Sequence, residues 1–133
     1  MASLSRDGVD IYYEYHESSR DDAPTILLSH GYSATSQMWR GQIKGLSEHA
    51  NVVVWDMRGH GESDSPEDQA LYSEAHTVED MAAILDACDV DKAIIAGLSL
   101  GGYMSLAFNL AFPERVTSLM LFDTGPGYKN DKA

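Results

Sequence analysis

The stretch Ala96-Gly97-Leu98-Ser99-Leu100-Gly101-Gly102 constrains the fold of this chain more than any other. Its centre fits G-x-S-x-G, a sharp turn that holds a serine between a strand and a helix. The serine backbone in such a turn is strained, and a Cβ two residues before or after it would collide with a neighbouring strand or helix. The motif therefore predicts that Ser99 is a nucleophile held on an α/β scaffold.

The residues on either side of the motif match the strand–turn–helix context that it requires. The apolar, β-branched run at 92–96 predicts a strand that leads into the turn. Apolar residues at helical spacing over 103–112 predict a helix after it, which Pro113 ends. An ordinary structural turn, without chemistry, is the alternative interpretation.

The rest of the chain predicts an α/β fold with a mostly parallel sheet. Continuous apolar runs at 25–29, 51–55 and 117–122 are typical of strands that are buried on both faces. Helical apolar spacing lies between these runs, so strands alternate with helices that flank the sheet. No linker or repeat interrupts the pattern, and we expect residues 1–133 to form one domain.

Local signals refine the positions of the other elements. Alternating apolar and polar residues over 3–9 and 10–16, joined at Asp7-Gly8, predict an antiparallel hairpin at the edge of the sheet. The spacing of Trp39, Ile43 and Leu46 predicts a helix over 36–48. The run Thr77-Val78-Glu79-Asp80 is similar to a capping box and predicts that a further helix begins there.

Four polar residues come directly after predicted strands: His30, Asp56, Ser99 and Asp123. Ligands of mostly parallel sheets bind beyond the carboxyl ends of the strands. We therefore expect these four side chains to share one rim of the sheet.

Composition excludes several classes of function. The net charge of −12 disfavours binding to nucleic acid or to an anionic membrane. No apolar run is long enough for a membrane span or a signal peptide, and the single cysteine, Cys88, cannot form a disulfide within the chain. We therefore expect a cytoplasmic protein. The sequence also contains no metal-ligand cluster, phosphate loop or dinucleotide fingerprint, so we expect no metal and no cofactor.

Three motifs in this order resemble the α/β-hydrolase family. His30-Gly31 is similar to the oxyanion-loop motif of that family, and the run 56–63, DMRGHGES, is similar to its D-x-R-G-x-G-x-S loop. The run 97–101 corresponds to its nucleophile elbow. The resemblance covers nearly the whole chain but only the N-terminal part of the family's fold, a truncated core. The most similar subgroup is that of small-ester and enol-lactone hydrolases.

The resemblance implies roles for individual residues. Ser99 would be the nucleophile, and the backbone N–H groups of Tyr32 and Leu100 would form the oxyanion hole. His30 would orient the oxyanion loop rather than transfer protons. A serine at position 99, in place of an aspartate, disfavours the epoxide-hydrolase and dehalogenase branches of the family.

Other polar residues have structural interpretations. We expect Asp56 and Arg58 to brace their own loop, because arginine forks lock onto carboxylates and carbonyl oxygens. His60 is expected to form hydrogen bonds within the same loop. The remaining histidines are expected at the surface: His16, His49 and His76.

The chain departs from the family's pattern at the catalytic base. A serine nucleophile needs a histidine, which in this family follows it in the sequence, and no histidine follows Ser99 here. His30 lies on the expected rim and is an alternative base. Asp123 is a candidate for the acid that orients the base; otherwise it caps the turn at Thr124-Gly125.

Several functions therefore stay open. The first is a serine hydrolase of carboxylic esters or lactones that works through an acyl-enzyme on Ser99, with its base supplied from elsewhere. The second is a non-catalytic binding module on the same scaffold, and the third is an acyltransferase or perhydrolase. The strand at 117–122 would be an unpaired edge, so we expect a homo-oligomer or a complementing chain as partner.

Overall fold

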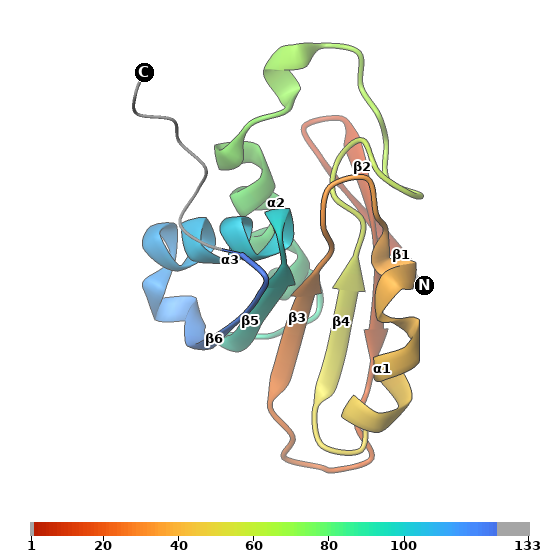
Figure 1. Ribbon diagram of the computed structural model, residues 1–133, viewed down its shortest axis with the longest axis vertical. Coiled ribbons are helices and arrows are strands. Elements are labelled where there is room, and N and C mark those ends of the chain that lie inside the picture. Colours follow the sequence, from red (N-terminus) through yellow and green to blue (C-terminus); the bar gives the residue numbers. More distant parts are fainter. Residues whose placement is uncertain (1, 125–133) are drawn as a thin grey trace.

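The structure, a computed structural model, describes residues 2–124 and contains a six-stranded sheet in the order β1-β2-β4-β3-β5-β6 (Figure 1). The pairs β1–β2 and β2–β4 are antiparallel, and the others are parallel. The predicted α/β sheet with its antiparallel N-terminal hairpin is confirmed. The strands are β1 (Ala2–Arg6), β2 (Val9–His16), β3 (Thr25–Ser29), β4 (Asn51–Trp55), β5 (Ala93–Leu98) and β6 (Val116–Phe122).

The N-terminal hairpin turns where the sequence predicted, but β1 ends at Arg6, three residues before the predicted end, and β2 begins at Val9, one residue before the predicted start. Asp7 and Gly8 both have positive φ, 53° and 82°, so they leave the extended conformation and end the ladder between Arg6 and Val9. On β2, Val9 and Ile11 are buried, whereas Asp10 is exposed. This alternation fixes which face of the hairpin packs against the rest of the molecule.

The helix predicted over 36–48 is a 3-10 turn, η1 (Ser36–Trp39), followed by a short helix, α1 (Arg40–Leu46). The Thr35 hydroxyl caps the first turn by accepting a hydrogen bond from the Gln37 N–H. Two glycines in a seven-residue helix lower its intrinsic stability, which agrees with an element shorter than its apolar spacing suggests.

The capping box predicted at Thr77–Asp80 is wrong. The helix α2 (Glu74–Ala87) begins three residues earlier, because the Ser73 hydroxyl accepts a hydrogen bond from the His76 N–H at 3.0 Å and acts as the N-cap. Thr77 lies inside the helix, and the fully buried Asp80 side chain has partners elsewhere.

The helix after the serine turn, α3 (Leu100–Ala111), also begins three residues before the predicted position and ends before Pro113. Further 3-10 turns are η2 (Gln69–Leu71) and η3 (Pro113–Arg115).

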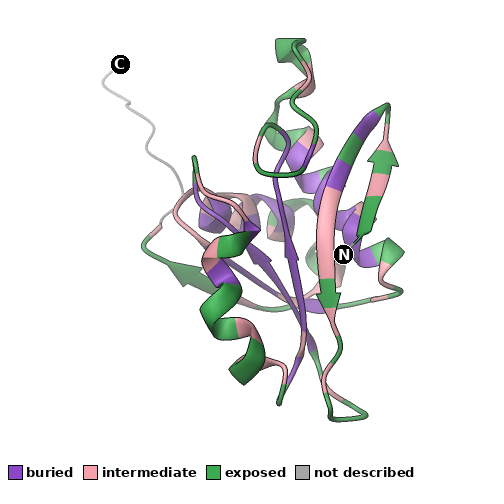
Figure 2. Ribbon diagram, turned by 90° about the vertical axis from the view of Figure 1, so that its right-hand side faces the viewer, coloured by how far each residue is buried: buried purple, intermediate pink, exposed green. Residues whose placement is uncertain are grey.

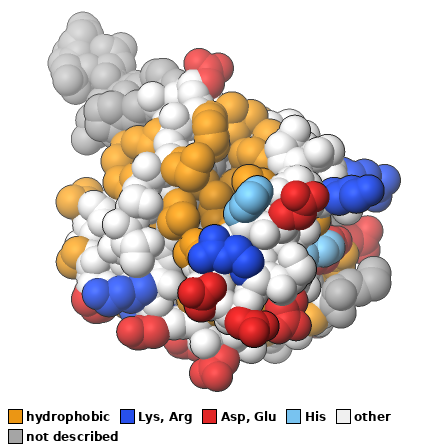
Figure 3. All heavy atoms as spheres, turned by 90° about the horizontal axis from the view of Figure 1, so that it is seen from below, with side chains coloured by type: hydrophobic (Ala, Val, Ile, Leu, Met, Phe, Trp, Pro, Cys, Tyr) orange, Lys and Arg blue, Asp and Glu red, His pale blue; other side chains and the backbone are white. Residues whose placement is uncertain are grey.

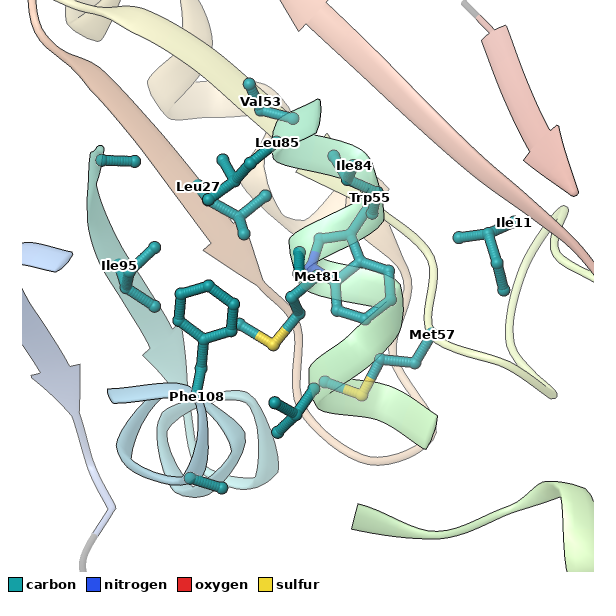
Figure 4. Close-up of a cluster of buried hydrophobic side chains, with 14 of the residues drawn as sticks. Ile11, Leu27, Val53, Trp55, Met57, Met81, Ile84, Leu85, Ile95 and Phe108 are labelled. Carbon is teal, nitrogen blue, oxygen red and sulfur yellow. The ribbon is translucent and has the colours of Figure 1, made fainter. Parts of the chain in front are cut away.

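Helices cover both faces of the sheet, and each face has its own apolar core (Figure 1). At the centre of the sheet, β3 is buried along its whole length, and β4 is buried from Val52 onward (Figure 2). On the larger side, Phe108 of α3 and Met81 of α2 point toward each other above Leu27 and Ile95 (Figure 4). The smaller core on the other face is closed by η1 and α1: Trp39, Met38, Ile43 and Leu46 pack against Ile26, Leu28, Val52, Val54 and Ala96.

One edge of the sheet is apolar and open to solvent. β6 pairs only with β5 within residues 2–124, and its side chains Met120, Leu121 and Phe122 are each about 40% exposed. The surface carries a continuous area of hydrophobic side chains, with charged groups around it (Figure 3). Apolar surface on an unpaired edge strand is a template for association with another chain.

Candidate active site

The sharp turn after β5 holds Ser99 in a strained conformation. Its φ of 54° and ψ of −114° lie outside the helical and extended regions, at a cost of about 1–3 kcal/mol for a residue with a side chain. The Ser99 N–H donates to the Phe122 carbonyl oxygen at 3.0 Å, and the Thr124 hydroxyl donates to the Ser99 carbonyl oxygen at 2.7 Å. The end of β6 thus holds the serine backbone on both sides, and the predicted strand–turn–helix context is confirmed.

The two glycines of the motif are required by close approach. A Cβ at Gly97 would lie 2.6 Å from the Gly102 nitrogen at the start of α3. A Cβ at Gly101 would lie 2.6 Å from the His30 carbonyl oxygen, at the end of β3. The predicted collisions with a neighbouring helix and a neighbouring strand are therefore confirmed. Because Gly97 and Gly101 have no Cβ, α3 can pack closely against the sheet next to Ser99.

The first rim loop, residues 30–36, follows β3 and reaches the serine. A Cβ built on Gly31 would lie 3.7 Å from the Ser99 Cβ and 3.4 Å from the Leu98 carbonyl oxygen. Neither the Tyr32 N–H nor the Leu100 N–H donates a hydrogen bond to a residue among 2–124. Both donors are therefore free for a ligand, and the Leu100 N–H also lies at the N-terminus of the twelve-residue helix α3, which favours negative charge.

His30 is fully buried beneath the first rim loop and uses both of its ring nitrogens. Nδ1 lies 2.7 Å from the Gly31 carbonyl oxygen, and Nε2 accepts from the Met57 N–H at 2.9 Å. Burial, more than any other influence, lowers the pKa of His30 below 6.5 and keeps the ring neutral. These bonds agree with the predicted orienting role, which stays a prediction, and they leave no ring nitrogen for the Ser99 hydroxyl.

The second rim loop, residues 56–63, is built around the buried carboxylate of Asp56. Its Oδ1 accepts from the Ser36 N–H at 2.7 Å, and its Oδ2 accepts from the Glu62 N–H at 2.9 Å. The Ser63 hydroxyl donates to the Asp56 carbonyl oxygen at 2.6 Å. Asp56 therefore braces its own loop, as predicted, and also ties it to the first rim loop.

Arg58 braces the second rim loop from the other side. Its Nε and Nη2 donate to Asp80 at 2.7 and 3.0 Å, and its Nη1 donates to the Leu71 carbonyl oxygen at 2.8 Å. Arg6 of β1 donates to the same buried carboxylate at 2.8 Å. Sequence analysis did not find Asp80 as this partner. A signal was present in the sequence: Asp80 lies among the apolar, buried positions of α2, where a charge without a partner would be costly, so a basic partner could have been expected.

The open end of the rim lies at Asp123 and Thr124. The register pairs Leu98 with Phe122, so Asp123 follows β6 where Ser99 follows β5. Asp123 is exposed, has a φ of 50°, and its carboxylate makes no hydrogen bond or ion pair within residues 2–124. Its role as the orienting acid stays a prediction, and Gly125 of the alternative turn lies outside the described residues. The hydroxyl of Thr124, a contact that sequence analysis did not identify, is the group that binds the serine backbone.

Other histidines lie away from a catalytic arrangement with the serine. His60 forms hydrogen bonds within and between the rim loops, as predicted for a loop residue. His16 pairs with Glu14, and His76 accepts from Arg6, so both are engaged at the surface, while His49 is exposed.

A cleft of about 250 Å³ opens beside the elbow. Apolar side chains line part of its wall, among them Met57, Leu100 and Met104, and Tyr72 borders it as well. Polar residues also line it, namely Arg58, Ser73, Glu74 and Thr77, so the cleft offers a ligand both apolar and polar contacts next to Leu100.

Residues 2–124 hold no group of three or more His, Cys, Asp or Glu side chains arranged to bind a metal ion. None of the helices in this part of the chain combines the length and the apolar character needed to cross a membrane.

A model of the alpha/beta hydrolase fold matches residues 24–133. Among curated proteins, a putative 2-succinyl-6-hydroxy-2,4-cyclohexadiene-1-carboxylate synthase from Bacillus subtilis is 32% identical over 119 residues, which are 90% of this chain and 43% of that protein.

Solved structures agree with this match. A hydrolase from Pseudomonas aeruginosa superposes with a TM-score of 0.89 at 32% identity, over 98% of this chain and 48% of its own. The enol-lactonase from Burkholderia xenovorans LB400 superposes with a TM-score of 0.84 at 28% identity, over 92% of this chain and 46% of its own. The chain thus spans less than half the length of each of these three relatives.

Proposed function

The chain belongs to the alpha/beta hydrolase fold family, and we propose that it carries the nucleophile and oxyanion hole of a serine hydrolase that acts on small carboxylic esters or lactones. Ser99 is the proposed nucleophile. The similarity to an enol-lactonase supports the choice of substrate class, as does the partly apolar cleft beside Leu100.

A single observation carries the proposal: Ser99 is held at φ 54° directly beside Gly31 of the first rim loop. A strained residue persists only where its surroundings hold it, and such residues are concentrated at functional sites. Leu100 directly follows Ser99, Tyr32 directly follows Gly31, and neither N–H donates a hydrogen bond within residues 2–124, which supports their proposed role as oxyanion donors. An ordinary structural turn would need neither the strain nor the free donors.

The proposed reaction follows from these groups. Ser99 Oγ attacks the carbonyl carbon of the ester, and its proton passes to a base. The carbonyl oxygen becomes an oxyanion that accepts hydrogen bonds from the N–H groups of Tyr32 and Leu100. The C–O bond breaks, and the base returns the proton to the leaving alkoxide. Water then attacks the acyl carbon while the base takes one of its protons. The bond between the acyl carbon and Ser99 Oγ breaks, the base returns the proton to Oγ, and the carboxylic acid leaves.

The base in this proposal is a histidine that this copy of the chain does not supply. No histidine follows Ser99, and both nitrogens of His30 are bound to the backbone. We propose that it comes from a polypeptide that joins the open edge of β6, either a complementing segment or a second copy of the chain. Asp123, exposed at this edge next to Ser99, is the proposed acid that orients the incoming histidine.

A non-catalytic binding module is the second candidate, and the missing histidine favours it. Acyl transfer to an acceptor other than water, including peroxide, would use the same residues as hydrolysis. The cytoplasm is the proposed compartment, since the single cysteine, Cys88, cannot form a disulfide within the chain.

The experiment is to treat the purified chain with a fluorophosphonate probe and a short-chain p-nitrophenyl ester, with and without added imidazole as a diffusible base. We expect Ser99→Ala to abolish labelling and turnover. The exposed Ser118 of β6 offers a matched control, since Ser118→Ala removes a serine far from the elbow chemistry. An intact oxyanion hole alone can leave about 10³–10⁴-fold acceleration over buffer.

The outcomes separate the candidates. Activity that appears only with imidazole and depends on Ser99 supports a hydrolase that lacks its base. Activity without imidazole supports a base supplied by another copy of the chain. A folded chain that stays unlabelled with imidazole at every concentration refutes the hydrolase and leaves the binding module. Product analysis with added alcohol or peroxide distinguishes acyl transfer from hydrolysis.

A further inference from the structure

Two histidines join the rim loops in a reciprocal arrangement. His30 of the first rim loop accepts from the Met57 N–H of the second at 2.9 Å, and its Nδ1 lies 2.7 Å from the Gly31 carbonyl oxygen. His60 of the second rim loop accepts from the Ser33 N–H of the first at 3.2 Å, and its Nδ1 lies 3.1 Å from the Arg58 carbonyl oxygen. Each imidazole therefore bridges its own loop to the other.

The partners determine where the protons are. A carbonyl oxygen only accepts and a backbone N–H only donates, so each ring carries its proton on Nδ1 and presents a lone pair at Nε2. A proton on Nε2 of His60 would face the Ser33 N–H, donor against donor. The bond between His60 and Ser33 thus exists only while the His60 ring is neutral.

The two rings differ in their access to solvent. His30 is fully buried, whereas His60 is partly exposed. Their centroids lie 4.8 Å apart, so a positive charge on one ring disfavours a charge on the other. Solvent therefore reaches the His60 ring more directly than the His30 ring.

The groups that face His60 do not compensate a charge on it by a direct bond. The Tyr32 ring meets it edge-on at 5.9 Å, and the Arg58 guanidinium is turned to Asp80. Both Asp56 oxygens accept from backbone amides, and the side chain of Glu62 is exposed. Within residues 2–124 no carboxylate is hydrogen-bonded to the His60 ring.

The residue that His60 holds is itself strained. Ser33 has a φ of 64°, a conformation that a residue with a side chain keeps only when its surroundings enforce it. It directly follows Tyr32, whose side chain is 77% exposed and offers little packing to fix the backbone. The Ala34 N–H also donates to the Gly31 carbonyl oxygen at 3.1 Å, so loss of the bond from Ser33 would leave Tyr32 and Ser33 held by this turn alone and free the Tyr32 N–H to reorient.

We propose that His60 is a positioning residue: its neutral imidazole holds the Ser33 N–H, and thereby the Tyr32 N–H, in the orientation that binds an oxyanion, and its protonation releases them. The inference deepens the proposed function, on which its catalytic consequence rests. The structural part, a proton-controlled bond between the rim loops, stands without any catalysis.

The first test is nuclear magnetic resonance of the full 133-residue chain, which needs no activity. Long-range ¹H–¹⁵N spectra at pH 8 should show the Nδ1–H tautomer for both His30 and His60. On titration to lower pH, the Ser33 and Tyr32 amide signals should shift with the same midpoint as the His60 ring. The variant His60→Gln keeps an acceptor without a titrating group, so these amides should then stay constant through that midpoint.

Two results would overturn the structural inference: an Nε2–H tautomer for His60, or a Ser33 amide titration that persists unchanged in His60→Gln. His49→Gln is the matched control, because His49 is exposed and lies outside both rim loops. In His49→Gln, the Ser33 and Tyr32 amide signals should shift with pH as they do in the parent chain.

The second test uses ester hydrolysis under the conditions that give activity, with imidazole if required. His60→Phe keeps an aromatic ring but removes the acceptor, and should lower kcat by roughly tenfold at pH 8 with little change in KM. This decrease in kcat is smaller than the 10²–10³-fold decrease that follows removal of a whole oxyanion donor. His60→Gln should restore kcat to within about threefold and remove one acidic limb of the pH profile.

The two tests fail separately. If the chain shows no Ser99-dependent activity but Ser33 titrates with His60, the proposed function fails and the proton-controlled bond stands. If activity is present and His60→Phe has the kcat and pH profile of the parent, the positioning role is refuted while the hydrolase remains.

Discussion

The two sides of the candidate site differ in how completely this chain builds them. On the closed side, the two rim loops, the polar groups of His30, Asp56, Arg58 and Ser63 are buried, and each is hydrogen-bonded. On the open side, residues 120–124, three apolar side chains are about 40% exposed, and the Asp123 carboxylate has no partner within residues 2–124. The groups proposed to bind an oxyanion are thus fixed by this chain alone, whereas those proposed to move protons depend on what joins the open side.

The largest effect should come from the closed side, through Asp80. This fully buried carboxylate accepts from both Arg6 and Arg58. Asp80→Leu leaves the buried Arg58 guanidinium without a carboxylate partner, whereas Arg6 keeps its ion pair with Glu79. We expect the free energy of unfolding to fall by about 4 kcal/mol, as for one partner removed from a buried ion pair. Urea denaturation of the two proteins measures the difference.

Two further variants test that cause. Asp86 forms an exposed ion pair with Arg115, and Asp86→Leu should change the free energy of unfolding by at most about 1 kcal/mol. The double variant Arg58→Met with Asp80→Leu should recover part of the loss, because it removes the buried charge together with its partner. A single variant as stable as the parent would mean that the closed side does not depend on this ion pair.

A second, smaller effect concerns the glycine at the junction of the two sides. Gly101→Ala brings a Cβ to within 2.6 Å of the His30 carbonyl oxygen, and this neighbour is backbone at the end of a central strand. We expect a loss of about 3 kcal/mol, the upper part of the range for overpacking. Gly41→Ala is the control, since a Cβ there meets nothing within 4 Å and should stabilise α1 by about 0.5–1 kcal/mol. Equal effects of the two substitutions would contradict the close approach.

Local patterns predicted the parts of the fold that local physics decides. The strands at 25–29 and 51–55 have the predicted bounds, because a short apolar run between polar residues can be buried on both faces only as a central strand. The strained Ser99 and its glycines were predictable for a similar reason: the motif encodes a collision between neighbours within a few residues.

Contacts between distant residues were not predictable in this way. Asp80 was assigned to a capping box because its position in Thr77–Asp80 fits that pattern, whereas its real partners are 22 and 74 positions away in the sequence. The bond from Ser33 to His60 spans 27 positions, and that from Thr124 to Ser99 spans 25. Such pairings depend on which loops the sheet order brings together, and no local periodicity records them.

A third prediction concerns the acid sensitivity of the closed side. Burial lowers the pKa of His30 below 6.5 in the folded protein, so the unfolded chain takes up this proton first as the pH falls. The contribution of His30 to stability is therefore complete above about pH 6.5 and is lost progressively toward its folded pKa. The loss is at most about 1.4 kcal/mol per pH unit for one proton.

The measurement is urea denaturation between pH 8 and pH 5. His30→Gln should have lower stability at pH 8 but a shallower decline toward acid than the parent chain, because it has one titrating group fewer. His49→Gln, at an exposed position, should keep the parent's slope. An unchanged slope in His30→Gln would mean that the acid sensitivity arises elsewhere.

The smallest effect on stability, but the clearest on association, is expected on the open side. Met120 of β6 is 41% exposed on the unpaired edge strand, and Met120→Lys places a charge where a second chain would have to pair. The free energy of unfolding should change by no more than about 0.5 kcal/mol, since the side chain is already partly in solvent.

Leu110 of α3, 83% exposed, offers a substitution of the same kind, Leu110→Lys, away from that edge. If the open side joins a second copy, size-exclusion chromatography with light scattering should show an oligomer for the parent and Leu110→Lys, and a monomer for Met120→Lys. A parent chain that is a stable monomer would instead assign the edge to a different polypeptide, and an oligomer that survives Met120→Lys would move the interface away from β6.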